Sequence, residues 1–208
     1  MYNKSDESGR TMLETIMYIS LLIVLGASIA QYISGAFRRY KIGRTAQQVL
    51  DFKKAIVQFT AADEDYTQLS IAHMDAQHAI PLDMRAAPGT ARHALGGSVT
   101  AGPDTDTEVV GKYMFFITFD HIFQGGCVEI LTQGQFYGDG SEMDTLIVNN
   151  KFAWRYEHSF HKTTGIPTVH TVMPNSTNMP AANIRLTITD ALSACNQRED
   201  NTITWIFS

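Results

Sequence analysis

The chain has 208 residues and a formal net charge of -5, because 16 Lys and Arg stand against 21 Asp and Glu. Hydrophobic residues make up 44% of the sequence and charged residues 18%, which excludes an intrinsically disordered chain and a collagen-like repeat. Two cysteines are too few for a small disulfide scaffold. A chain of this length can bury a sizeable core as one domain with an appendage. Its acidic balance argues against nucleic acid as the main partner.

An uncharged run of 23 residues, Thr15–Phe37, stands near the N-terminus. As an α-helix it would reach about 35 Å, enough to cross the roughly 30 Å hydrocarbon core of a membrane. Its content of Leu, Ile, Met and Val favours a helix over a strand. We therefore expect a membrane-compatible helix, with a buried helix of a soluble protein as the alternative.

The sequence that follows, residues 38–63, has the pattern of an amphipathic helix. Apolar residues recur at intervals of three and four, at Ile42, Ala46, Val49, Phe52, Ile56 and Phe59. The polar positions that this pattern leaves to water are Arg44, Gln48, Asp51 and Lys54. Because no proline interrupts the chain from Met12 to Thr60, we expect one helix of about 45 to 50 residues. Its first half would lie in lipid or a protein bundle, and its second half would cover a sheet.

A short polar segment precedes the apolar run and includes a carboxylate, Glu14. A charge at the edge of a membrane helix is unfavourable unless it is paired, so Glu14 is a candidate functional residue. Gly9, a short spacer and Glu14, leading into a long apolar helix, resemble the type III signal of type IV pilins and pseudopilins. In that family a membrane-embedded aspartyl peptidase cuts after the glycine and N-methylates the new terminus.

The resemblance implies roles for individual residues of this chain. Gly9 would be the last leader residue, Arg10 the new N-terminus, Thr11 the usual second residue, and Glu14 the acidic residue at position five of the mature chain. The terminal ammonium and the Glu14 carboxylate would neutralise one another between adjacent subunits and set their axial register. Two features depart from the family pattern. Arg10 stands where Phe is usual, and the leader MYNKSDESG is not rich in Lys and Arg.

Two features of the same segment favour other interpretations. Ser28-Ile29-Ala30 places small residues where a secretory signal peptide is cut, which would release a protein that begins at Gln31. Four basic residues follow the apolar run and two precede it, so the positive-inside rule alone would place the C-terminal domain in the cytoplasm. The constellation of glycine and glutamate favours the pilin interpretation over both.

The sequence from residue 64 onward predicts an antiparallel-sheet domain. Residues 64–112, rich in Pro, Gly and small residues, predict a short helix followed by a long loop. Strand-like runs then follow at Tyr113–Phe119, Thr145–Asn149, Phe152–Tyr156, Thr168–Met173, Ile184–Ile188 and Thr202–Phe207. Asn149-Asn150 predicts a tight hairpin turn. Short helices are predicted at Cys127–Leu131 and at Thr189–Cys195, the second with Thr189 or Asp190 as its N-cap.

The two cysteines of the chain, Cys127 and Cys195, lie on these two predicted short helices. Type IVb-like pilins have a similar order of elements, so the resemblance covers the whole chain in outline. The export into an oxidising compartment that the resemblance implies favours one disulfide between Cys127 and Cys195. Two unrelated free thiols are the alternative.

Other clusters of side chains carry weaker signals for chemistry. His158 and His161 would point to opposite faces of a strand, and no third metal ligand is near them in the sequence. The loop carboxylates of Asp104–Glu108 and Asp139–Asp144 lack the EF-hand pattern for Ca²⁺ and are expected to be solvated. Lys151–Tyr156 is expected to be a core strand rather than a site that stacks DNA bases. With no nucleophile elbow, Walker motif or dinucleotide motif, no enzyme, cofactor or metal site is predicted.

Together these observations predict an α+β, pilin-like protein, in which a long N-terminal α-helix packs on a C-terminal antiparallel β-sheet domain. The helix is apolar in its first half and amphipathic in its second. The expected parts are a leader peptide at 1–9, an apolar helix at 10–37, the amphipathic half at 38–63 and the sheet domain at 64–208.

The resemblance implies a structural subunit of a type IV pilus. The chain would be held in the inner membrane with its domain on the periplasmic side, and then assembled into an extracellular filament. Its partners would be copies of itself, the prepilin peptidase and the inner-membrane assembly machinery. The alternatives are a minor pilin or secretion-system pseudopilin, and a membrane-anchored or secreted binding domain that does not polymerise.

Overall fold

The computed structural model describes residues 5–61, 65–104, 114–133, 136, 143–150, 152–155 and 186–207, with the backbone alone for 5–11 and 152–155. The chain divides into two compact units, Met1–Lys41 and Ile42–Ser208. One helix of 56 residues, α1 (Ser5–Thr60), contributes to both units. It begins earlier than the predicted start at Met12.

The first unit is the N-terminal part of α1. All its described side chains, from Met12 to Lys41, are exposed. The helix is long and apolar enough, by length and composition, to cross a membrane. A helix that is apolar on all sides normally lies inside a protein or a membrane, so this surface requires an apolar environment.

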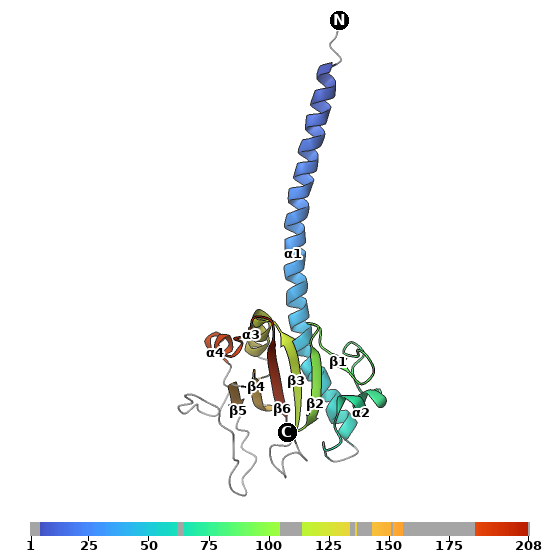
Figure 1. Cartoon of the computed structure of the whole chain (residues 1–208), viewed down its shortest axis with the longest axis vertical. Helices are drawn as coiled ribbons and strands as arrows, with labels where there is room; N and C mark the ends of the chain where they lie inside the picture. Colours follow the sequence, from blue (N-terminus) through green and yellow to red (C-terminus); the bar gives the residue numbers. More distant parts are fainter. Residues whose placement is uncertain are drawn as a thin grey trace. The chain divides into compact units, whose positions relative to one another are not determined.

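The second unit is built on one antiparallel sheet. Among the described residues its strands are β1 (Ala91–Arg92), β2 (Ser98–Pro103), β3 (Phe115–Ile122), β4 (Met143–Val148), β5 (Phe152–Arg155) and β6 (Asn201–Phe207). Their order in the sheet is β1-β2-β3-β6-β4-β5, and every neighbouring pair is antiparallel. The last strand of the chain therefore lies in the middle of the sheet, beside β3 (Figure 1).

Three short helices complete this unit: α2 (Ile71–Ala76), α3 (Gln124–Thr132) and α4 (Ile188–Ala194). They confirm the short helix predicted after residue 64 and the two predicted around the cysteines. The predicted N-cap of the last helix is wrong. Thr187 caps α4, and Asp190 is the third helical residue, whose carboxylate accepts a hydrogen bond from the backbone N–H of Thr187.

The core lies between the sheet and the second half of α1. The predicted apolar stripe is confirmed: Ile42, Ala46, Val49, Phe52 and Ile56 are buried, and Phe59 packs against the core. Buried and half-buried residues alternate along β6, as expected for a strand with one face on the core. Trp205 of that strand is fully buried.

Two strand predictions are wrong. Residues 64–112, expected to hold no strand, contain β1 and β2. The small residues of β2 have little intrinsic strand propensity, and pairing of Val99–Pro103 with β3 makes this segment a strand. Ile184–Ile188 was expected to be a strand, but Leu186 and Thr187 lie in none and Ile188 begins α4.

Four further strand predictions agree with the structure to within a few residues. Four of the predicted runs correspond to β3, β4, β5 and β6. The predicted hairpin turn is confirmed, since Asn149 and Asn150 join β4 to β5 with φ values of 53° and 56°. The predicted strand at Thr168–Met173 lies outside the described residues.

Candidate functional site

The predicted processing and assembly residues lie near the start of α1. The backbone of Gly9, Arg10 and Thr11 is helical, and their side chains lie outside the described residues. The Glu14 side chain is exposed. Residues four apart share one face of an α-helix, so positions 10 and 14 lie one turn apart on that face. The pairing of the Glu14 carboxylate with the terminal ammonium of a neighbouring subunit stays a prediction.

The apolar surface that follows Glu14 is the largest exposed feature of the first unit. Its most exposed aliphatic members include Leu22 and Ile23, at 67% and 66% exposure. Burying such a side chain contributes about 1.5–3 kcal/mol. A surface of this size on a bare helix is therefore suited to a lipid environment or to packing against other helices.

The second unit is closed by a disulfide bond. Cys127 of α3 and Cys195 at the end of α4 are bonded, with their Cα atoms 5.9 Å apart and their sequence positions separated by 68. Both side chains are fully buried. The predicted disulfide is confirmed, and the alternative of two free thiols is wrong.

Two asparagines connect the same end of α4 to the sheet. Nδ2 of Asn149 donates to the carbonyl oxygen of Ala194 at 2.8 Å and to Oδ1 of Asn201 at 2.9 Å. Asn201 is fully buried and donates to the carbonyl oxygen of Ile122 at 2.9 Å. The sequence identified Asn149 only as a turn residue, and its role in this network carries no local sequence signal.

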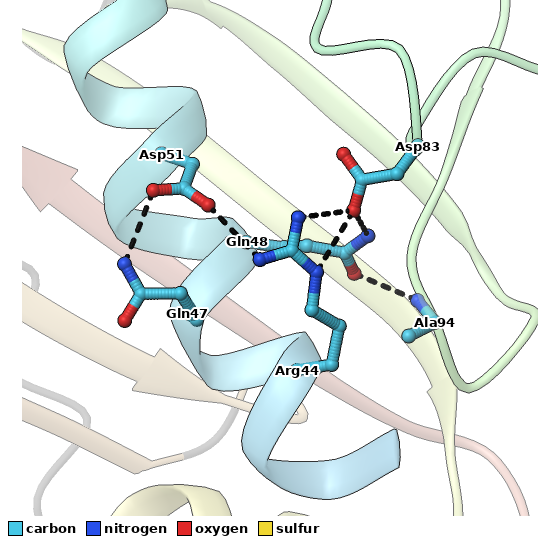
Figure 2. A network of polar contacts seen from close by, with 6 residues as sticks. All are labelled: Arg44, Gln47, Gln48, Asp51, Asp83 and Ala94. Carbon is cyan, nitrogen blue, oxygen red and sulfur yellow. Dashed lines mark hydrogen bonds and ion pairs between the residues drawn. The ribbon is translucent and has the colours of Figure 1, made fainter. Parts of the chain in front are cut away.

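A second polar network ties α1 to the segment before β2 (Figure 2). Nε2 of Gln48 donates to Oδ2 of Asp83 at 2.7 Å, and its Oε1 accepts from the backbone N–H of Ala94, also at 2.7 Å. Arg44 donates to the same Asp83 oxygen at 2.6 Å and forms an ion pair with Asp51 at 3.3 Å.

Gln48 corrects one sequence expectation. The helical pattern placed it in water with Arg44 and Asp51, but its side chain is 1% exposed. The side chain can be buried because both its nitrogen and its oxygen form hydrogen bonds within the protein. The spacing of apolar residues along the sequence does not reveal such partners. Burial alone would raise the pKa of the Asp83 carboxyl, but hydrogen bonds from Gln48 and Arg44 outweigh it and lower that pKa.

The clusters with weaker chemical signals give no metal site in the described part of the chain. There, no three His, Cys, Asp or Glu side chains are placed to hold a metal ion. His158 and His161, and most of the two groups of loop carboxylates, lie outside the described residues. The Lys151–Tyr156 segment contains β5, an edge strand of the sheet, and the packing of its side chains stays a prediction.

Comparison with known proteins gives one family and several similar folds. A family model described as PilS N terminal matches residues 39–208. A type IV b pilin from Salmonella typhi is 17% identical, with 78% of this chain and 97% of that chain covered and a TM-score of 0.49. TcpA, a type IV pilin from the El Tor biotype of Vibrio cholerae, is 15% identical, with 81% and 99% covered and a TM-score of 0.47. The search of curated proteins gives no match.

The match to the family model extends over most of the chain. Its range includes the amphipathic half of α1, every strand of the described sheet and both cysteines. The sequence predicted the amphipathic half of the helix, the disulfide and the strands β3, β4, β5 and β6 for a pilin-like protein. The chain therefore belongs to the type IV pilin family, in the group that the PilS N-terminal model describes.

Proposed function

We propose that the chain is a structural subunit of a type IV pilus, made as a membrane-anchored precursor, cut after Gly9 and polymerised through α1. The observation that carries this proposal is the exposed apolar surface of α1 on a chain of the pilin family. Before assembly the surface would lie in the inner membrane. After assembly it would be covered by the same helix of neighbouring subunits.

Such an arrangement explains why the helix changes character along its length. The described side chains from Met12 to Phe37 are exposed, whereas the part of the helix from Ile42 covers the sheet. Subunits joined through the first part would make head-to-tail contacts that do not close on themselves, and such contacts generate a helical filament. The sheet domains would face water outside the cell.

Glu14 would determine the register between subunits. A carboxylate at the edge of an apolar bundle is unfavourable without an opposite charge beside it. Cleavage after Gly9 would create that charge as the terminal ammonium of Arg10. The pairing between neighbours would then favour one axial displacement over others.

The processing step is tested by the intact mass and N-terminal sequence of the protein isolated from cells that contain the prepilin peptidase. We expect the chain to begin at Arg10. A chain that begins at Gln31 would support a secretory signal peptide, and one that keeps Met1 would support a permanent anchor. Either result would contradict the proposed processing.

The register role is tested by Glu14→Ala, with Glu129→Ala as its matched control. Glu129 is an exposed carboxylate on α3, so its loss removes the same charge away from α1. We expect Glu14→Ala to abolish filaments seen by electron microscopy and Glu129→Ala to leave them unchanged. Normal filaments from Glu14→Ala would contradict the role.

The abundance of the chain in purified filaments separates a major subunit from a minor one.

A further inference from the structure

His93 is a buried histidine between β1 and β2 that belongs to neither the assembly helix nor the disulfide. Its side chain is 3% exposed. Nε2 lies 2.8 Å from the carbonyl oxygen of Asp120, and Nδ1 lies 3.3 Å from the backbone nitrogen of Leu95. A carbonyl oxygen only accepts and a backbone N–H only donates, so Nε2 carries the proton and Nδ1 carries none. The two contacts together require a neutral imidazole in one tautomer.

The surroundings of the ring fix its position. It stacks on Phe119 of β3, with centroids 5.0 Å apart and planes 4° from parallel. On another side lies Gly97, where an added Cβ would stand 2.4 Å from Nε2 and 2.0 Å from the carbonyl oxygen of Asp120. The absence of a side chain at Gly97 is what allows the ring to reach that carbonyl.

The backbone of His93 also closes the turn between the two strands. Its N–H donates to the carbonyl oxygen of Gly97 at 3.1 Å, and its own carbonyl oxygen accepts from Gly96 at 2.8 Å. The next residue, Ala94, donates to Gln48 of α1. The ring of His93 and this turn are therefore parts of one hydrogen-bonded unit at the edge of the sheet.

The charged and polar groups near the ring belong to β3, to the residues just before β6 and to α1. Asp120 of β3 accepts from the backbone N–H and the hydroxyl of Ser98 and from Nδ1 of His121, so its carboxylate is already engaged. His121 also lies 3.7 Å from Asp200, next to β6. On α1, the neutral amide of Gln48 accepts from the backbone N–H of Ala94, the residue after His93, and donates to Asp83.

These groups act on the titration of His93 in opposite directions. Burial lowers the pKa of His93 below the ordinary 6.5, and the charge of His121 lowers it further, whereas the carbonyl and the carboxylate of Asp120 raise it. A lowered pKa means that the neutral ring stabilises the fold. That contribution is complete above about pH 6.5 and is lost as the pH falls through the pKa of the folded state.

We propose that His93 is an acid-sensitive lock on the β1–β2 turn. In the neutral ring, Nδ1 accepts from the backbone N–H of Leu95. When Nδ1 takes a proton from solvent, it becomes a donor and its N–H faces the N–H of Leu95. The bond from Leu95 is lost, and the segment Ala91–Ser98 opens. Pairing of β3 with β6 and of β6 with β4 does not involve this segment, so the rest of the sheet stays closed. The lock is independent of filament assembly.

The test is hydrogen exchange of the full chain in detergent micelles, followed by mass spectrometry and corrected for the intrinsic effect of pH. Between about pH 7.5 and about pH 5, the wild-type protection of amides in Ala91–Ser98 should fall by about tenfold or more. His93→Gln keeps a donor toward Asp120 but does not titrate, and should change by less than about twofold. His121→Asn, which removes the neighbouring histidine, should keep the acid-dependent loss.

Equal losses of protection in wild type and His93→Gln would overturn the proposal. If His93→Gln fails to fold, a measurement on the wild-type protein still tests the proposal. In that case ¹⁵N spectra of histidine-labelled protein report the protonation of each ring nitrogen. We expect the His93 ring to be neutral at pH 7 with its proton on Nε2 and to gain the second proton together with the loss of protection. A His93 ring that is doubly protonated at pH 7 would contradict the lock.

Discussion

Gly97 is the residue whose substitution should disturb the second unit most per atom added. A Cβ there would stand 2.0 Å from the carbonyl oxygen of Asp120 in the backbone of β3, a distance at which the backbone must move. We expect Gly97→Ala to lower the free energy of unfolding by about 1–3 kcal/mol, the range for overpacked sites. Thermal unfolding of the full chain in detergent measures it.

The control for Gly97→Ala is the same substitution at Gly43. This glycine lies inside α1, and an added Cβ meets nothing within 4 Å. Alanine is the better helix former by about 0.5–1 kcal/mol, so Gly43→Ala should raise the stability. Equal effects of the two substitutions would show that the close approach at Gly97 is not required.

Gln48 is the residue where a helical pattern and the folded chain disagree. Gln48→Ala would leave the Ala94 N–H without its acceptor and remove a donor from Asp83. We expect a loss of about 1–3 kcal/mol in unfolding free energy, as for an orphaned buried donor. Gln47→Ala is the matched control. Its half-buried side chain donates to Asp51, and its loss should cost no more than about 0.5 kcal/mol. A smaller effect at Gln48 than at Gln47 would contradict this assignment.

At the scale of the element, α4 tests which residue begins a helix. Both the hydroxyl of Thr187 and the carboxylate of Asp190 cap the first turn. Thr187→Ala should therefore cost about 0.5–2 kcal/mol. Thr189→Ala, at an exposed position two residues further, should change the stability by less than about 0.5 kcal/mol. Chemical unfolding of the two variants compares them, and the reverse order would restore the N-cap that the sequence suggested.

The elements differ in how far the sequence determines them. The apolar stripe of α1 and the strands β3 and β6 follow from periodicity, because each buries one face against the core. The start of α4 has a local sequence signal, the capping-box spacing of Thr187 and Asp190. The β-branched residues around it favoured a strand instead. In contrast, β2 consists largely of small residues and exists because β3 pairs with it. The burial of Gln48 likewise depends on residues 35 and 46 positions away.

The candidate assembly site was accessible to sequence reasoning for a different reason. Glycine, spacer, glutamate and apolar run are contiguous, so no tertiary contact is needed to recognise them. The disulfide needed an inference about export as well, because two cysteines 68 residues apart can equally remain free. The site of His93 has no sequence signature, since its ring is specified by Asp120, Leu95 and Gly97 only after the sheet has formed.

For the whole molecule, the division into two units leads us to expect that the apolar part of α1 mediates association and that the second unit folds without it. Among the described residues the buried core lies within Ile42–Ser208, and the disulfide joins two helices of that unit. A chain shortened to residues 38–208 should therefore be a soluble monomer without detergent, with the Cys127–Cys195 bond intact and near-ultraviolet circular dichroism like that of the full chain. The full chain should need detergent under the same conditions, because its exposed apolar helix requires cover. Light scattering after size exclusion measures both. Aggregation of the shortened chain, with the full chain monomeric in plain buffer, would mean that the first unit completes the core instead.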